Sequence, residues 1–292
     1  MAFFAAGDQV GDWEIVRRIG VGGMGVVYAA RHAVIGKRAA IKVVHTHFRE
    51  RRTIVDRFVQ EARVVNLIAH PSIVDIFQLG WLDDGRVYLV MEFLMGRSLT
   101  RRRKDGPIST SESIALLSQL CCPLAGAHAH GVVHRDLKPD NIFITEGGLA
   151  PRVKLLDWGL CALLSDEERS IREATRVGTP RYIAPEQAWG NPVDERADIY
   201  SLGVVAYELI LGRAPFESDD VEALAHMHAF DPPPPPRALW PEIPRDLESL
   251  LISMLEKDPA DRPSLGAVQA TLLALGGTLP DRSSPLSDLL AS

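Results

Sequence analysis

The hydrophobic periodicity changes once along this chain of 292 residues, and that change constrains the fold more than any other feature. Up to about residue 93 the pattern is typical of strands, in segments 12–19, 25–31, 38–44, 73–82 and 87–93. One helical stretch, 53–69, interrupts them. Beyond Gly96 the apolar spacing is helical, in segments 111–130, 197–211, 219–229, 245–256 and 264–275. The sequence therefore predicts an α+β fold with a small sheet-rich lobe and a larger, mainly helical lobe.

Composition and charge exclude several classes of protein. A hydrophobic content of 46% with 24% charged residues is typical of a soluble globular protein. The net charge of −6 argues against nucleic acid as a partner, and no stretch approaches the roughly 18 apolar residues that a membrane span needs. Three cysteines without metal-ligand spacing favour a reducing compartment, so we expect a cytoplasmic protein that does not insert into membranes.

The first candidate site is a glycine-rich segment formed by Gly20, Val21, Gly22, Gly23, Met24 and Gly25. Glycines let backbone N–H groups approach and cradle phosphates. The pattern is weak alone, and the residues after it decide its class. A dinucleotide-binding motif continues into a helix, whereas residues 26–30 have the character of a strand. The segment therefore predicts a hairpin over a nucleotide.

Lys42 lies in the middle of the apolar strand 38–44. A lysine in a strand is most often a solvated edge residue, but a buried amine beside a phosphate-binding loop needs an acidic partner. Glu61 lies on the apolar face of helix 53–69, and Glu50 is the rival in an arginine-rich stretch before that face begins. We expect Glu61 to pair with Lys42 and to hold it against the α- and β-phosphates.

Residues 134–141 read His-Arg-Asp-Leu-Lys-Pro-Asp-Asn, and Asp157-Trp158-Gly159 begins sixteen residues after the last of them. Residues 184–186 are Ala-Pro-Glu. Together with the glycine-rich segment, Lys42 and Glu61, these motifs resemble the protein kinase family in order and spacing, and most closely its bacterial serine/threonine members. The resemblance runs from about residue 12 to residue 275 and implies the bilobal kinase fold.

The resemblance also implies a domain organisation. An antiparallel β-sheet lobe with one helix is expected at about 12–92, a hinge at 92–96 and a helical lobe at 97–275. Residues 1–11 form an N-terminal extension, and residues 276–292 form a short tail. We expect no sensor domain or membrane anchor in these ends, so regulation would act through the chain's own loops, a regulatory protein partner or a homodimer.

By this resemblance the catalytic work is divided among a few side chains. Asp136 orients the substrate hydroxyl and accepts its proton, while Lys138 neutralises the γ-phosphate. Asn141 and Asp157 hold Mg²⁺, with Mn²⁺ as an alternative metal. Phosphoryl transfer asks a protein mainly for positioning and charge neutralisation, so the implied cofactors are ATP and Mg²⁺ and the implied partners are protein substrates.

The resemblance further implies an adenine pocket. The matching residues are Val27 and Ala40 for its roof, Phe143 for its floor, Met91 for its back, and the backbone of Glu92 and Leu94 for the hydrogen bonds to the base.

Two segments indicate serine and threonine as the acceptors. Lys138 stands two residues after the catalytic aspartate, as in serine/threonine kinases, and Thr179 matches the threonine that bonds the catalytic aspartate and lysine. Arg135 indicates control by activation-loop phosphorylation. We expect autophosphorylation at Thr175, with Ser170 and Ser165 as secondary sites.

Other residues match structural parts of the family. Glu186 and Arg262 match a buried ion pair, and Asp198 matches the aspartate that supports the catalytic loop. Trp158 replaces the usual phenylalanine with a larger ring whose indole N–H prefers a partner.

Two segments have a plain interpretation. The proline run 232–236 is expected to be a connector rather than a peptide ligand, and the basic run 101–104 a solvated helix end rather than a docking site. A pseudokinase scaffold and a small-molecule kinase remain alternatives to a protein kinase. The intact set of catalytic residues disfavours the scaffold, and the segment 178–186, which shapes a peptide platform in the family, disfavours the small-molecule kinase.

Overall fold

The computed structural model describes residues 3–23, 25–46, 52–146, 152–158 and 181–276. The chain forms two compact units, and each is described separately. The N-terminal unit comprises the chain up to Met95 together with Asp157 and Trp158, and the C-terminal unit comprises the other described residues.

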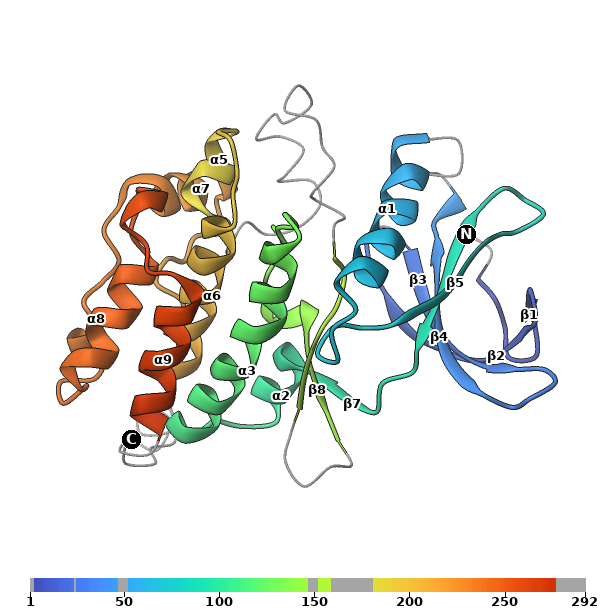
Figure 1. Cartoon of the computed structure of the whole chain (residues 1–292), viewed down its shortest axis with the longest axis horizontal. Helices are drawn as coiled ribbons and strands as arrows, with labels where there is room; N and C mark the ends of the chain where they lie inside the picture. The colour runs from blue at the N-terminus through green and yellow to red at the C-terminus, as the bar shows by residue number, and fades with distance from the viewer. Residues whose placement is uncertain (1–2, 24, 47–51, 147–151, 159–180, 277–292) are drawn as a thin grey trace. The chain divides into compact units, whose positions relative to one another are not determined.

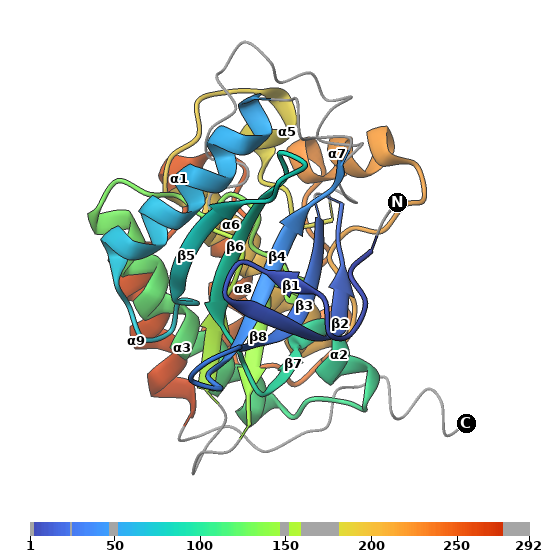
Figure 2. The same cartoon turned by 90° about the vertical axis from the view of Figure 1, so that its right-hand side faces the viewer.

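The N-terminal unit is built on an antiparallel sheet. Its strands, in spatial order, are β1 (Gln9–Val10), β2 (Trp13–Val21), β3 (Gly25–His32), β4 (Arg38–Val44), β6 (Val87–Glu92) and β5 (Ile76–Trp81). Helix α1 (Arg52–Ile68) packs against β5 and β6, as Figure 2 shows. The periodicity predicted strands with one helix, and the family resemblance implied that the sheet is antiparallel; both are present.

Alternation along β4 gives the sheet two different faces. Ala39, Ile41 and Val43 join a buried apolar cluster on one face. Lys42 points to the opposite face, where its side chain lies near Glu61 of α1. Gly25 at the start of β3 lies so close to β4 that a Cβ atom would come within 2.3 Å of the Val43 carbonyl oxygen, which requires glycine there.

The C-terminal unit is mainly helical (Figure 1). Its helices are α2 (Leu99–Lys104), α3 (Thr110–Ala129), α5 (Pro185–Trp189), α6 (Arg196–Leu211), α7 (Val221–Phe230), α8 (Arg245–Met254) and α9 (Leu265–Gly276). A three-stranded sheet has the order β7 (Gly96–Ser98), β8 (Ile142–Thr145) and β9 (Arg152–Leu155). Short 3₁₀ helices are η2 (Pro139–Asn141), η3 (Pro236–Ala238) and η4 (Pro259–Asp261).

Helix α6 forms the centre of this unit. All of its residues after Arg196 are buried, and α3, α5, α8 and η4 pack against it. A helix surrounded in this way needs small or apolar residues on every side, which explains its low amphipathicity. Its polar residues Asp198, Ser201 and Glu208 are therefore expected to make hydrogen bonds or ion pairs.

The five long helices expected beyond Gly96 are present, with ends that differ by one or two residues. The sheet β7-β8-β9 and the short helix α5 were not predicted, and of α2 only the helix end at 101–104 was expected. The proline run is a connector between α7 and η3, as expected, and the carbonyl of Pro234 accepts a hydrogen bond from the Tyr207 hydroxyl at 3.0 Å. Within the described ranges, we find no helix with the length and hydropathy of a membrane span.

Candidate active site

The amine of Lys42 lies between two carboxylates in the N-terminal unit. Its Nζ atom donates to Oδ1 of Asp157 at 2.5 Å and lies 3.7 Å from Oε2 of Glu61, which makes the second contact an ion pair without a hydrogen bond. Lys42 and Glu61 are both buried, and the Phe58 ring of α1 lies 5.3 Å from the amine. The expected Lys42–Glu61 pair is present, but Asp157 is the nearer partner.

Burial and charge act in opposite directions on this cluster. Burial lowers the pKa of Lys42, but the carboxylates of Asp157 and Glu61 outweigh it and raise that pKa above its ordinary value. Burial raises the pKa of Glu61 to about 7, although the charge of Lys42 acts to lower it. Glu61 therefore exchanges its proton near neutral pH while Lys42 stays charged.

The glycine-rich segment forms the turn between β2 and β3, with Val21 opposite Val26 in the sheet. The N–H of Gly22 donates to the carbonyl of Gly25 at 2.8 Å and closes the turn. Gly20, Gly22, Gly23 and Gly25 lie in the hairpin that the sequence predicted, and Met24 lies outside the described residues. Val27 lies opposite Lys42.

The remaining expected adenine residues fall in both units. Ala40 of β4 lies opposite Met91 of β6, and Glu92 lies opposite Ala39. Leu94 belongs to the same unit. Phe143 belongs to β8 of the C-terminal unit, where it lies opposite Ser98 of β7.

The loop that carries Asp136 lies in the C-terminal unit. Nζ of Lys138 donates to both carboxylate oxygens of Asp136, at 2.9 and 2.7 Å. The amide nitrogen of Asn141 donates to Oδ2 of Asp136 at 3.0 Å and to its carbonyl oxygen at 2.8 Å. Because two side chains hold one carboxylate, its orientation is fixed. Leu156, which precedes Asp157 in the chain, donates its N–H to the Asn141 carbonyl at 2.9 Å.

A buried carboxylate anchors this loop through hydrogen bonds to its backbone. Asp198, at the start of α6, is fully buried and accepts hydrogen bonds from the backbone N–H groups of His134 and Arg135, both at 2.9 Å. Nε2 of His128 lies 2.8 Å from the same carboxylate. Arg135 adopts a φ of +63°, a left-handed conformation that a residue other than glycine keeps only where its surroundings stabilise it.

His134 completes the anchorage. Its Nδ1 accepts from the N–H of Asp136 at 3.3 Å, and its Nε2 lies 3.1 Å from the carbonyl oxygen of Leu156. A carbonyl can only accept, so the ring hydrogen lies on Nε2. His134 thereby ties the aspartate loop to the strand that leads to Asp157.

Comparison with known proteins identifies the arrangement. Residues 13–272 match the protein kinase domain family. The chain belongs to this family. Among its relatives, serine/threonine-protein kinase Pkn1 of Myxococcus xanthus is 45% identical over 88% of this chain and 37% of that protein. Serine/threonine-protein kinase PknB of Mycolicibacterium smegmatis is 34% identical over 94% of this chain and 45% of that protein.

A solved structure also resembles the chain. The kinase domain of Mycobacterium tuberculosis PknI is 26% identical, with a TM-score of 0.74 over 94% of this chain and 100% of that domain. These matches confirm the kinase fold and the resemblance to bacterial serine/threonine kinases. The chain spans less than half the length of Pkn1 and PknB.

The ion pair expected in the kinase's helical part is present. Arg262 donates to both carboxylate oxygens of Glu186, at 2.7 and 2.8 Å, and both side chains are buried. The remaining donors of the guanidinium bond the carbonyls of Glu256, Arg196 and Lys257. A buried charge that is paired and fully hydrogen-bonded in this way is tolerated in a protein interior.

Several predicted residues lie in a segment that the structure does not describe. The segment 159–180 lies outside the described residues and contains Gly159, Ser165, Ser170, Thr175 and Thr179. Glu50 also lies outside them, in the segment 47–51. Trp158 is described and is fully buried.

Sequence reasoning missed a polar cluster around Glu208 of α6. This buried carboxylate pairs with Arg103 of α2 at 2.9 Å and with Arg181 at 3.1 Å, and it accepts a hydrogen bond from the Tyr182 hydroxyl at 2.6 Å. Burial, together with the charge of Glu208, raises the pKa of Tyr182. The basic run is therefore more than a solvated helix end, and the one available signal was a glutamate within an apolar helix.

Proposed function

We propose that this chain is an active serine/threonine protein kinase that transfers the γ-phosphate of ATP, with Mg²⁺, to protein hydroxyls. The observation that carries the proposal is the Asp136 carboxylate, held by Lys138 and Asn141 in a loop anchored on buried Asp198. A scaffold without catalysis would have no need to fix this carboxylate.

In the proposed reaction Asp136 orients the attacking hydroxyl and accepts its proton, which is the role of a general base. Lys138, whose amine contacts the Asp136 carboxylate, would also neutralise the γ-phosphate. Lys42 would hold the α- and β-phosphates, because its pKa is raised and it stays charged. The work of these residues is positioning and electrostatic stabilisation.

The oxygen donors fit a hard divalent cation. The amide nitrogen of Asn141 is used by Asp136, so its amide oxygen is the atom that a metal would take. The Asp157 carboxylate would supply the second protein ligand, and Mn²⁺ suits the same oxygen donors. When bound, the metal neutralises charge on the phosphate oxygens. We propose the residues expected from the sequence as the adenine contacts: Val27, Ala40, Met91, Glu92, Leu94 and Phe143.

Regulation by phosphorylation of the activation loop belongs to this proposal. Arg135 lies beside the catalytic aspartate and would pair with a phosphate on Thr175, and Lys138 with Thr179 supports serine and threonine as acceptors. A cytoplasmic location fits the free thiols of Cys121 and Cys122.

The test measures transfer of γ-phosphate to a generic serine/threonine substrate by wild type, Asp136→Asn and Asp140→Asn. Asp140 is exposed in the same loop and serves as the matched control. We expect Asp136→Asn to lower the rate by about 100-fold or more, the range for loss of a general base, and Asp140→Asn to keep most of it. Phosphopeptide mapping of the active protein should find Thr175 modified. Equal, negligible labelling by all three proteins would favour a scaffold.

A further inference from the structure

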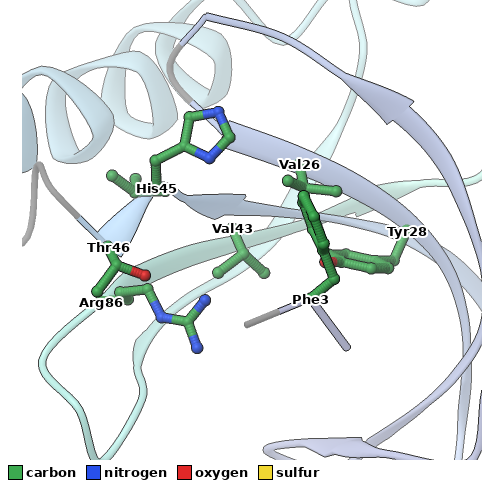
Figure 3. Close-up of a pocket in the computed structure, with 8 residues that line it drawn as sticks. Phe3, Val26, Tyr28, Val43, His45, Thr46 and Arg86 are labelled. Atoms are coloured by element: carbon green, nitrogen blue, oxygen red, sulfur yellow. The ribbon is translucent and has the colours of Figure 1, made fainter. Parts of the chain in front are cut away.

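A histidine contacts the glycine-rich segment from the end of the neighbouring strand. His45 comes directly after the last residue of β4, is 8% exposed, and has its Nε2 atom 2.9 Å from the carbonyl oxygen of Gly22. The carbonyl can only accept, so Nε2 carries the hydrogen and donates it. Figure 3 shows the imidazole ring extending away from the side chains of Thr46 and Arg86.

His45 directly follows β4, and the cluster residues Ala39, Ile41 and Val43 precede it at alternate positions of that strand. It lines a small pocket together with Val26 and Tyr28, which belong to the same cluster (Figure 3). Lys42, by contrast, lies on the other face. The hydrogen bond from His45 therefore links the end of β4 to the turn between β2 and β3.

The direction of that carbonyl sets the direction of the next amide. A peptide group is planar and, in every described bond, trans, so its C=O and N–H point in opposite directions. With the Gly22 carbonyl directed to His45, the N–H of Gly23 points away from the His45 ring. The N–H of Gly22 is already used by the Gly25 carbonyl inside the turn. The turn is thus held by a hydrogen bond on each side of Gly22.

We propose that His45 is a positioning residue for ATP, which fixes the orientation of the Gly22–Gly23 peptide in the turn that would bind the phosphates. The proposal rests on the proposed kinase function. A donor aimed in advance at a phosphate oxygen lowers the ordering cost of binding, and a backbone N–H is well suited to a phosphate anion. His45 itself does not touch the nucleotide, so its effect should depend on the presence of phosphates.

The test compares two ligands: a non-hydrolysable ATP analogue with Mg²⁺, and adenosine, which has no phosphates. Their dissociation constants are measured for wild type, His45→Leu and His45→Gln. We expect His45→Leu to raise the dissociation constant of the analogue about 3- to 10-fold, as for loss of one hydrogen bond, and to leave that of adenosine unchanged. His45→Gln, whose amide can donate to the same carbonyl, should restore binding of the analogue.

His32→Leu is the matched control. His32 lies in the same sheet, and its Nδ1 accepts from the N–H of Val34 in the turn between β3 and β4. This variant should bind both ligands as wild type does. If His45→Leu fails to fold, His45→Asn, whose amide is too short to reach Gly22, replaces it with the same expected values.

The outcomes separate the two proposals. Loss of affinity for both ligands in His45→Leu, or for neither, would overturn the role of His45 while leaving the kinase function intact. Failure of His45→Gln to restore binding would overturn it as well. Wild-type protein that binds neither ligand would overturn the proposed function, and with it this role.

Discussion

The two units hold their charged residues by different means. In the N-terminal unit, Lys42 donates a hydrogen bond to Asp157, but charge alone links it to Oε2 of Glu61, which accepts no hydrogen bond from the described residues. In the C-terminal unit, Asp198 receives hydrogen bonds at 2.8–2.9 Å from three residues. An arrangement held by charge responds to protonation and to added phosphates, whereas one held by hydrogen bonds to a buried carboxylate keeps its shape. We therefore expect the N-terminal cluster to be adjustable and the loop that carries Asp136 to be rigid.

The largest effect should come from Asp198→Asn, which breaks the rigid arrangement. The asparagine is the same size, but its NH₂ group would face N–H groups whose hydrogen bonds the carboxylate now accepts. We expect a loss of about 3–5 kcal/mol in the free energy of unfolding, because buried donors lose their acceptor and the charge they surround. Denaturant unfolding measures it, and phosphate transfer should fall in parallel.

Asp246→Asn is the matched control for this change. Asp246 also lies in the first turn of a helix, α8, but is exposed, so its substitution should alter the free energy of unfolding only slightly. Similar losses in the two variants would contradict the view that Asp198 anchors the loop.

Glu61→Gln tests the adjustable cluster through pH. The pKa of Glu61 is about 7 in the folded protein against an ordinary 4.5, so between these values the unfolded state has already lost the proton that the folded state keeps. The contribution of Glu61 to stability is therefore complete below pH 4.5 and is lost as pH rises through about 7. The free energy of unfolding falls by at most about 3 kcal/mol as the carboxyl of Glu61 loses its proton.

Glutamine stays neutral and does not suffer this loss. The free energy of unfolding of Glu61→Gln, relative to wild type, should therefore rise between pH 4.5 and pH 7.5, as denaturant titrations across that range would measure. Glu222→Gln, on the exposed surface of α7, controls for the change in formal charge. Parallel pH curves for wild type and Glu61→Gln would show that the carboxyl of Glu61 is not shifted by burial.

The N-terminal unit shows what local pattern can and cannot predict. Strand 38–44 was predicted with the bounds of β4, because alternation within one strand decides which face each side chain takes. The partner of Lys42 was predicted less well. Glu61 is present at 3.7 Å, but the nearest carboxylate belongs to Asp157, which is 115 residues away in the chain. No periodicity reports such a contact.

The C-terminal unit shows the same limit in its short elements. The strands β7, β8 and β9 have three or four residues each, too few to display a period. The basic run 101–104 resembled a solvated helix end, and two of its arginines do pair locally, Arg101 with Asp105 and Arg102 with Glu112. The partner of Arg103 is Glu208, whose burial depends on the packing of the whole unit.

The smallest effect should come from Gln187→Leu, which removes one of several contacts to the catalytic loop. Nε2 of Gln187 donates to the Arg135 carbonyl at 2.9 Å, while Asp198 holds the N–H of the same residue. Because Asp198 remains, we expect a loss of only about 1 kcal/mol in the free energy of unfolding and a modest fall in phosphate transfer. If Gln187→Leu proved as damaging as Asp198→Asn in denaturant unfolding, the rigidity of the loop would rest on α5 as much as on α6. Should the loss stay near that of one hydrogen bond, the buried carboxylate of α6 is what makes the catalytic loop rigid.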